Sequence, residues 1–381
     1  MDDYFKHSLF LNYDEKIKLS NAISKHIFNV LNDVKDHGII ANVYLSGSLA
    51  RREPSVIYRN GHYHLNSDID FIIILDSEFN NDENWLMNIT DYLNRKYPSY
   101  KDSVIIAPKE KMNHFISCIG KDFELGLNNP LYESFPIIKE TVTRVTKDDL
   151  FDCIVHQFTC YYLNSAFLEG HKDIFNKDIN YSYIKMLLEC LRIQLYDTGY
   201  EYIRYYNIYS NAESLGKLLG VNSHDIIGLL KARELFGKEK IPSIKLFDFL
   251  VYTICRLFEL SDNAEEENLI DHLLFFLVNR ARLGESFLKK YQCCVAMFAL
   301  ACEANDKYKT TFIDNCFLTL NSISSFLAEE TYFANFKNME LSEKLFQTRQ
   351  LLSSLRKKYL DELTIKDTGN SGFSDINKTE T

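Results

Sequence analysis

The chain has 381 residues, of which 46% are hydrophobic and 25% charged, with a formal net charge of −10. This composition is that of a folded protein with room for two ordinary domains, and it excludes a disordered or fibrous chain. The net negative charge argues against a protein that tracks extended nucleic acid, because such proteins usually carry a basic surface.

The sequence shows no pattern that would direct the protein to a membrane or out of the cell. The sequence contains no apolar run of membrane-spanning length, so we expect no membrane partner. Its N-terminus lacks the basic region and apolar core of a signal peptide. Nine cysteines are scattered without a Cys-x-x-Cys pair, which favours reduced thiols over a disulfide framework. We therefore expect a cytoplasmic protein.

The first part of the chain alternates helical and strand patterns. Apolar residues at helical spacing predict a first helix, and Pro98 ends a later one. Between the first two strands, a Gly-Ser turn leads into a short helix, and an inserted hairpin follows. In chain order, we expect helix Tyr13–Asp36, strand Asn42–Ser46, a short helix carrying Arg51 and Arg52, hairpin Pro54–Asn66, strand Asp68–Leu75, helix Asn81–Tyr97, and strands Ser103–Ala107, His114–Ile119 and Lys121–Leu127.

Beyond about residue 140 the pattern becomes helical throughout. The expected helices are Asp149–Leu168, Tyr181–Thr198, Ala212–Leu219, Ser223–Leu235, Leu246–Leu260, Glu265–Gly284, Phe287–Ala304, Thr311–Glu329 and Ser342–Leu363. The sequence therefore predicts an α+β protein, with α/β as the alternative for its first part: a mixed sheet with flanking helices in an N-terminal domain at 1–140, an all-α domain at 141–365, and a polar, disordered tail at 366–381.

Two aspartates at the start of the strand Asp68–Leu75 are the strongest chemical signal. Strand alternation places Asp68 and Asp70 on one face and Ile69 on the other. Neighbouring carboxylates repel unless a cation lies between them, and Mg²⁺ is typically held by carboxylates together with substrate phosphates. Gly47 and Ser48, 21 and 20 positions before Asp68, can present N–H groups and a hydroxyl to phosphate oxygens.

This ordered combination resembles the nucleotidyltransferase superfamily typified by DNA polymerase β. The segment Gly47-Ser48-Leu49-Ala50-Arg51, with Ser67 before the Asp-x-Asp pair, is similar to a bacterial branch that includes minimal nucleotidyltransferases and aminoglycoside adenylyltransferases. The resemblance covers roughly residues 40–130, and the inserted hairpin makes the gap between its two halves longer than is usual in the family. It implies a polymerase-β-like sheet and a two-metal mechanism with Mg²⁺, for which Mn²⁺ can substitute.

The resemblance also implies a third carboxylate on a later strand, within an apolar-acid-apolar triplet. Phe123-Glu124-Leu125 supplies Glu124 as the first choice, and Asp122, on the same expected face, is the alternative. A solvated sheet face remains open for either residue. Asp68, Asp70 and Glu124 would then be the catalytic and metal-binding residues, with Glu124 also a candidate general base.

The resemblance further implies the nucleotide-binding residues. Gly47 and Ser48 would hold the triphosphate, and Arg51 would clamp it, because a guanidinium matches phosphate oxygens bidentately. In the helical domain, Lys185 would reach the triphosphate, while Glu189 on the same helix face could accept a hydrogen bond from the acceptor. The alternative for this helix is a surface salt-bridge helix.

The expected activity is Mg²⁺-dependent transfer of a nucleoside monophosphate from an NTP, with ATP as the default donor, to a hydroxyl acceptor, releasing pyrophosphate. The acceptor could be a small polar molecule or a protein side chain. One alternative is a non-catalytic or antitoxin-like nucleotide-binding module. A second is a signalling-nucleotide synthase or an RNA tail-adding enzyme, the latter disfavoured by the net charge of −10. Base preference, acceptor and oligomeric state stay open.

Overall fold

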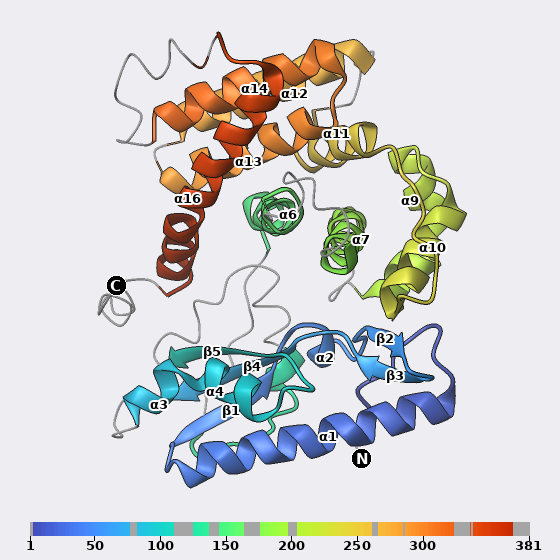
Figure 1. Cartoon of the computed structure of the whole chain (residues 1–381), viewed down its shortest axis with the longest axis vertical. Coiled ribbons are helices and arrows are strands. Elements are labelled where there is room, and N and C mark those ends of the chain that lie inside the picture. Colours follow the sequence, from blue (N-terminus) through green and yellow to red (C-terminus); the bar gives the residue numbers. More distant parts are fainter. Residues whose placement is uncertain are drawn as a thin grey trace.

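The structure, a computed structural model, describes residues 3–76, 82–109, 125–136, 145–163, 176–196, 204–260, 266–284, 286–323, 336 and 338–368. It is mostly helical, with two small mixed sheets, which confirms the α+β class at that level. In Figure 1 the sheets lie at one end of the molecule and most helices at the other, with helices α6 (Lys147–Tyr162) and α7 (Asn176–Ile193) seen nearly end-on between them.

The first sheet contains the strand that carries the aspartates. Strand β4 (Ile69–Leu75) lies at its centre, antiparallel to β1 (Ala41–Leu45) and parallel to β5 (Asp102–Pro108). Ile69, Phe71 and Ile73 of β4 join one apolar core, whereas Ile72 and Ile74 join a smaller core on the opposite face. The alternation predicted for this strand is therefore present, and Asp70 shares the face of Ile72.

The second sheet joins the two halves of the chain. Strands β2 (Val56–Arg59) and β3 (His62–Leu65) form the predicted hairpin, with positive φ angles at both turn residues, Asn60 and Gly61. The expectation of an all-α second half is wrong in one detail, because β6 (Leu235–Phe236) pairs in parallel with β2. Two residues are too few to produce a recognisable strand pattern.

Helix α1 (Tyr13–Asp36) has the predicted bounds because its sequence encodes both ends. Asn12 and Glu15 form a capping box at its N-terminus, and Gly38 follows its C-terminus with a φ of 65°. The helix runs beneath the sheets in Figure 1 and buries its apolar stripe against the first one. A buried contact of 2.8 Å between His26 Nε2 and Asp102 Oδ1 ties it to β5.

Two details of the first half differ from the prediction. The expected helix Asn81–Tyr97 is divided at Asn88 into α3 (Glu83–Met87) and α4 (Ile89–Lys96), although it ends before Pro98 as predicted. The short helix α2 (Gly47–Ala50) ends before the two arginines, and Arg52 adopts a left-handed φ of 62°. The expected strand His114–Ile119 lies outside the described residues.

The second half is built of amphipathic helices around one large apolar core. A helix is present at each of the nine expected places, but four predictions differ by five residues or more at one or both ends: Asp149–Leu168, Tyr181–Thr198, Thr311–Glu329 and Ser342–Leu363. The short α8 is additional because six residues carry little periodic signal. Besides α6 and α7, the helices of this half are α8 (Tyr205–Ser210), α9 (Ala212–Leu219), α10 (Ser223–Glu234), α11 (Leu246–Leu257), α12 (Glu266–Leu283), α13 (Phe287–Glu303), α14 (Asp306–Asn321) and α16 (Leu341–Thr368).

Contacts cross the predicted domain boundary at residue 140. Glu234, 5% exposed at the end of α10, accepts hydrogen bonds from the backbone N–H groups of Leu9, Phe10 and Leu11 at 2.7–3.1 Å. The boundary itself stays a prediction. Helix α16 continues three residues into the predicted tail, of which residues 369–381 lie outside the described part. No helix in the described part has the length and apolar character needed to cross a bilayer.

Candidate active site

The Gly-Ser turn lies directly against the second aspartate of the Asp-x-Asp pair. Gly47 has a φ of 60°, and a Cβ atom at this position would lie 2.2 Å from Asp70 Oδ2. The backbone N–H of Ser46 donates to the Asp70 carbonyl oxygen at 2.8 Å, which extends the antiparallel pairing of β1 and β4 by one residue at this end. Any other residue at 47 would strain the backbone and displace the carboxylate, so both the conformation and the space require glycine here.

Asp68 lies just before β4, in reach of solvent. Its side chain is 33% exposed, and its Oδ1 is 3.2 Å from Nζ of Lys101. The parallel pairing of Ile69 with Asp102 explains this contact, because Asp68 and Lys101 precede these two partners. The lysine side chain is 78% exposed, so the ion pair contributes little to stability and an incoming cation can replace it.

The third carboxylate is not placed, because Glu124 and Asp122 lie outside the described residues. The described end of the expected strand, Leu125–Leu127, has helical backbone, so the prediction that its side chains alternate between two sheet faces is wrong there. Gly126 packs closely against the carbonyl oxygen of Leu45, next to the Gly-Ser turn. Within the described ranges, no group of three or more His, Cys, Asp or Glu side chains is arranged to hold a metal ion.

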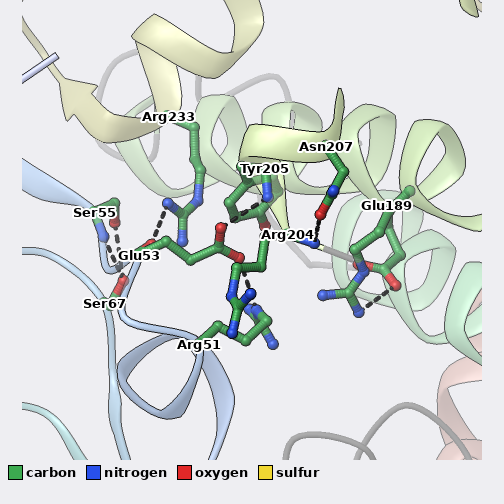
Figure 2. Close-up of polar contacts among 10 residues, drawn as sticks. Arg51, Glu53, Ser55, Ser67, Glu189, Arg204, Tyr205, Asn207 and Arg233 are labelled. Atoms are coloured by element: carbon green, nitrogen blue, oxygen red, sulfur yellow. Dashed lines mark hydrogen bonds and ion pairs between the residues drawn. The ribbon is translucent and has the colours of Figure 1, made fainter. Parts of the chain in front are cut away.

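The side chains predicted to contact phosphate at the turn are less exposed than expected. Ser48 is 9% exposed and Arg51 is 8% exposed. Arg51 Nε donates to Glu53 Oε1 at 2.9 Å, so its guanidinium is engaged with a buried carboxylate (Figure 2). A role of Arg51 as a triphosphate clamp stays a prediction.

Glu53 is the centre of a polar cluster that the sequence did not indicate. Its Oε2 accepts from the backbone N–H of Tyr205 at 2.7 Å, and its carbonyl oxygen accepts from Arg233 Nη1 at 2.6 Å. Arg233 also lies 4.1 Å from the centre of the Tyr205 ring. Burial raises the pKa of Glu53 despite the opposing charges of Arg51 and Arg233. Arg51 follows α2 directly, whereas Tyr205 lies in α8 and Arg233 in α10, 180 residues from Glu53 in sequence (Figure 2).

Helix α7 reaches the aspartate end of the sheet. The hydroxyl of Tyr181 lies 2.5 Å from Ser55 Oγ, which in turn lies 3.1 Å from Ser67 Oγ, one residue before Asp68. Nζ of Lys185 lies 5.0 Å from the centre of the Tyr181 ring. Burial lowers the pKa of Lys185, but the charges of Tyr181 and Asp68 outweigh it and raise this pKa above its usual value. Lys185 therefore lies within the electrostatic field of Asp68.

Glu189 is not available for the acceptor role predicted from the sequence. It is 8% exposed, and its Oε1 accepts from Arg192 Nη2 at 2.8 Å (Figure 2). Because both residues are buried, the alternative of a surface salt-bridge helix does not describe this face of α7 either.

Two cavities lie close to these elements without including the aspartates. The larger, of about 440 Å³, lies between the hairpin and the segment after β6, with Tyr58, Asn180 and Gly237 in its wall. The smaller, of about 190 Å³, is bordered by Leu49, Ala50 and Leu125, beside the Gly-Ser turn. Asp68 and Asp70 are both half-buried.

No protein-family model, curated protein or solved structure matches this chain significantly.

Proposed function

We propose that the protein is a Mg²⁺-dependent nucleotidyltransferase of the polymerase-β type. It would transfer a nucleoside monophosphate from an NTP to a hydroxyl group and release pyrophosphate. The observation that carries this proposal is the contact between Gly47 and the Asp70 carboxylate. It joins a phosphate-binding turn and a carboxylate pair at one end of one sheet, from sequence positions separated by an inserted hairpin.

The residues present fit a hard divalent cation in part. Asp68, just before β4, and Asp70, its second residue, offer carboxylate oxygens two positions apart, and the partly exposed side chain of Asp68 leaves room for an ion and its water. Glu124, or alternatively Asp122, would complete the set. When bound, Mg²⁺ would lower the pKa of the acceptor hydroxyl and neutralise charge on the triphosphate.

The chain's own residues would position the triphosphate. Helix α2 begins at the Gly-Ser turn, and the first N–H groups of a helix have no partner within the helix, so those of the turn could donate to phosphate oxygens. Lys185 would approach from α7, on the side of Asp68, and contribute a positive charge. The in-line geometry of the displacement would thus be set by two elements from different halves of the chain.

The structure says less about the acceptor than about the donor. Because Glu189 is paired with Arg192, we propose only that the acceptor carries a hydroxyl group and binds between the first sheet and α7. A direct test incubates the full-length protein with each radiolabelled NTP, Mg²⁺ or Mn²⁺, and a cell extract. We expect metal-dependent pyrophosphate release and a labelled acceptor. Binding of NTP without turnover for all four nucleotides would favour the non-catalytic module instead.

The third carboxylate can be identified by a pair of neutral substitutions. We expect Glu124→Gln to reduce turnover about a hundredfold or more while leaving NTP affinity within threefold, because Asp68 and Asp70 can still hold the triphosphate metal. Asp122→Asn should reduce turnover by less than tenfold. Steady-state kinetics and equilibrium NTP binding measure the two effects. The reverse result, with Asp122 essential and Glu124 dispensable, would assign the ligand to Asp122.

Lys185 should contribute mainly to NTP binding. We expect Lys185→Ala to raise KM for the NTP about 10- to 100-fold, equivalent to about 1.5–3 kcal/mol for a lost charged hydrogen bond. Lys185→Arg should retain part of the affinity because it keeps the charge. Lys217→Ala, which removes an exposed lysine of α9, is the matched control. An unchanged KM in Lys185→Ala would place the triphosphate away from α7.

A further inference from the structure

A cysteine, a histidine and an arginine meet on the side of α6, in a cluster that the proposed transferase chemistry does not use. His156 and Cys160 are one helical turn apart, so they share a face of α6, and Nε2 of His156 lies 3.7 Å from Cys160 Sγ. Arg356 of α16 points to the same sulfur, with Nη2 at 3.9 Å. Two polar groups, one from α6 and one from α16, thus converge on one thiol.

The cluster is open enough to react. His156 is exposed, whereas Cys160 and Arg356 are half-buried. Other cysteines of the helical half differ sharply: burial raises the pKa of Cys255, Cys293 and Cys302 to about 12. Thiols of that kind carry almost no thiolate at neutral pH and are inert.

In contrast to those cysteines, the electrostatic surroundings of Cys160 lower the pKa of its thiol. Burial alone raises its pKa, but the hydrogen bond and charge of His156, together with the charges of Arg356 and Lys185, outweigh burial and bring the pKa to about 7. The hydrogen bond to Cys160 in turn raises the pKa of His156, although the charges of Arg356 and Lys185 oppose it. The pair therefore favours a thiolate beside an imidazolium.

We propose that Cys160 is a thiol-modification site that forms a mixed disulfide with small, anionic disulfides. In this step the Cys160 thiolate attacks one sulfur of the reagent, a new S–S bond forms, the reagent's S–S bond breaks, and the other half leaves as a thiolate. The protein sulfur is oxidised and the departing half is reduced, so no further oxidant is needed. His156, Arg356 and Lys185 favour an anionic reagent over a cationic one.

The site does not depend on the nucleotidyltransferase proposal, because its chemistry needs only these side chains. Where that proposal also holds, an anionic adduct on Cys160 would lie in the field of Lys185 and weaken NTP binding. This consequence is separable from the modification itself, which is measured by mass.

The test treats the full-length protein with oxidised glutathione at several values between pH 5.5 and 9, and quantifies each cysteine peptide by mass spectrometry. We expect the modification rate of Cys160 to follow a midpoint near pH 7. At pH 6 it should exceed that of Cys153, a half-buried cysteine two turns earlier on α6, about tenfold. Cystamine, a cationic disulfide, should react more slowly at Cys160 than oxidised glutathione does.

Two substitutions test the role of the neighbours. His156→Gln should move the midpoint upward and slow the reaction at pH 6 about tenfold, and Arg356→Gln should have the same effect to a smaller degree. Circular dichroism would verify that each variant folds. In the wild-type protein, equal rates at Cys160 and Cys153, or a midpoint above pH 8.5, would overturn the proposal, as would an unchanged midpoint in a folded His156→Gln variant.

Discussion

Asp70→Asn is expected to reduce metal-dependent NTP turnover about a thousandfold, equivalent to about 4 kcal/mol in the activation free energy. Asparagine has nearly the same shape as aspartate, so the close contact with Gly47 is retained. What is lost is one negative ligand of the proposed metal pair. Removal of one of two neighbouring carboxylates also relieves their repulsion in the metal-free protein, so its Tm should hold or rise.

Pyrophosphate release and thermal unfolding would be measured on the same preparation, with and without Mg²⁺. Asp91→Asn, which neutralises an exposed aspartate of α4, is the matched control and should leave both quantities unchanged. Mg²⁺ should raise the Tm of the wild type and of this control, but not that of Asp70→Asn. Turnover of Asp70→Asn within tenfold of the wild type would contradict the assignment of the metal site.

Glu53→Ala should have the largest effect on stability, lowering the free energy of unfolding by about 3–5 kcal/mol. Glu53 is 2% exposed, and its carboxylate joins Arg51 to the backbone N–H of Tyr205. Alanine would leave a buried guanidinium and a buried N–H group without these acceptors. Because burial raises the pKa of Glu53, its charge is costly, and Glu53→Gln should therefore lose less stability than Glu53→Ala.

Urea unfolding followed by circular dichroism would measure both variants. The control is Glu239→Ala, which breaks a partly exposed ion pair with Lys231 at 3.2 Å and should cost less than about 1 kcal/mol. If Glu53→Ala cost no more than this control, the cluster around Glu53 would not connect the two halves of the chain energetically.

Local patterns determined most of the secondary structure. The capping box at Asn12 and Glu15 fixed the start of α1, and the Asn60-Gly61 turn fixed the hairpin register. Such features depend on residues a few positions apart, so they can be read from sequence. The break at Asn88 and the strand β6 could not be predicted from the sequence. The break interrupts an otherwise helical pattern, and β6 exists only through its pairing with β2.

For the candidate site, the sequence by itself determined that Asp68 and Asp70 lie two positions apart at the start of a strand and that a Gly-Ser turn precedes them, since both follow from spacing along the chain. Only the tertiary structure decided that Gly47 touches the Asp70 carboxylate and that α7 brings Lys185 into the field of Asp68. It likewise paired Arg51 with Glu53 and Glu189 with Arg192. Buried charges select partners by proximity in the fold, and proximity between Glu53 and Arg233, 180 residues apart, leaves no periodic trace in a single sequence.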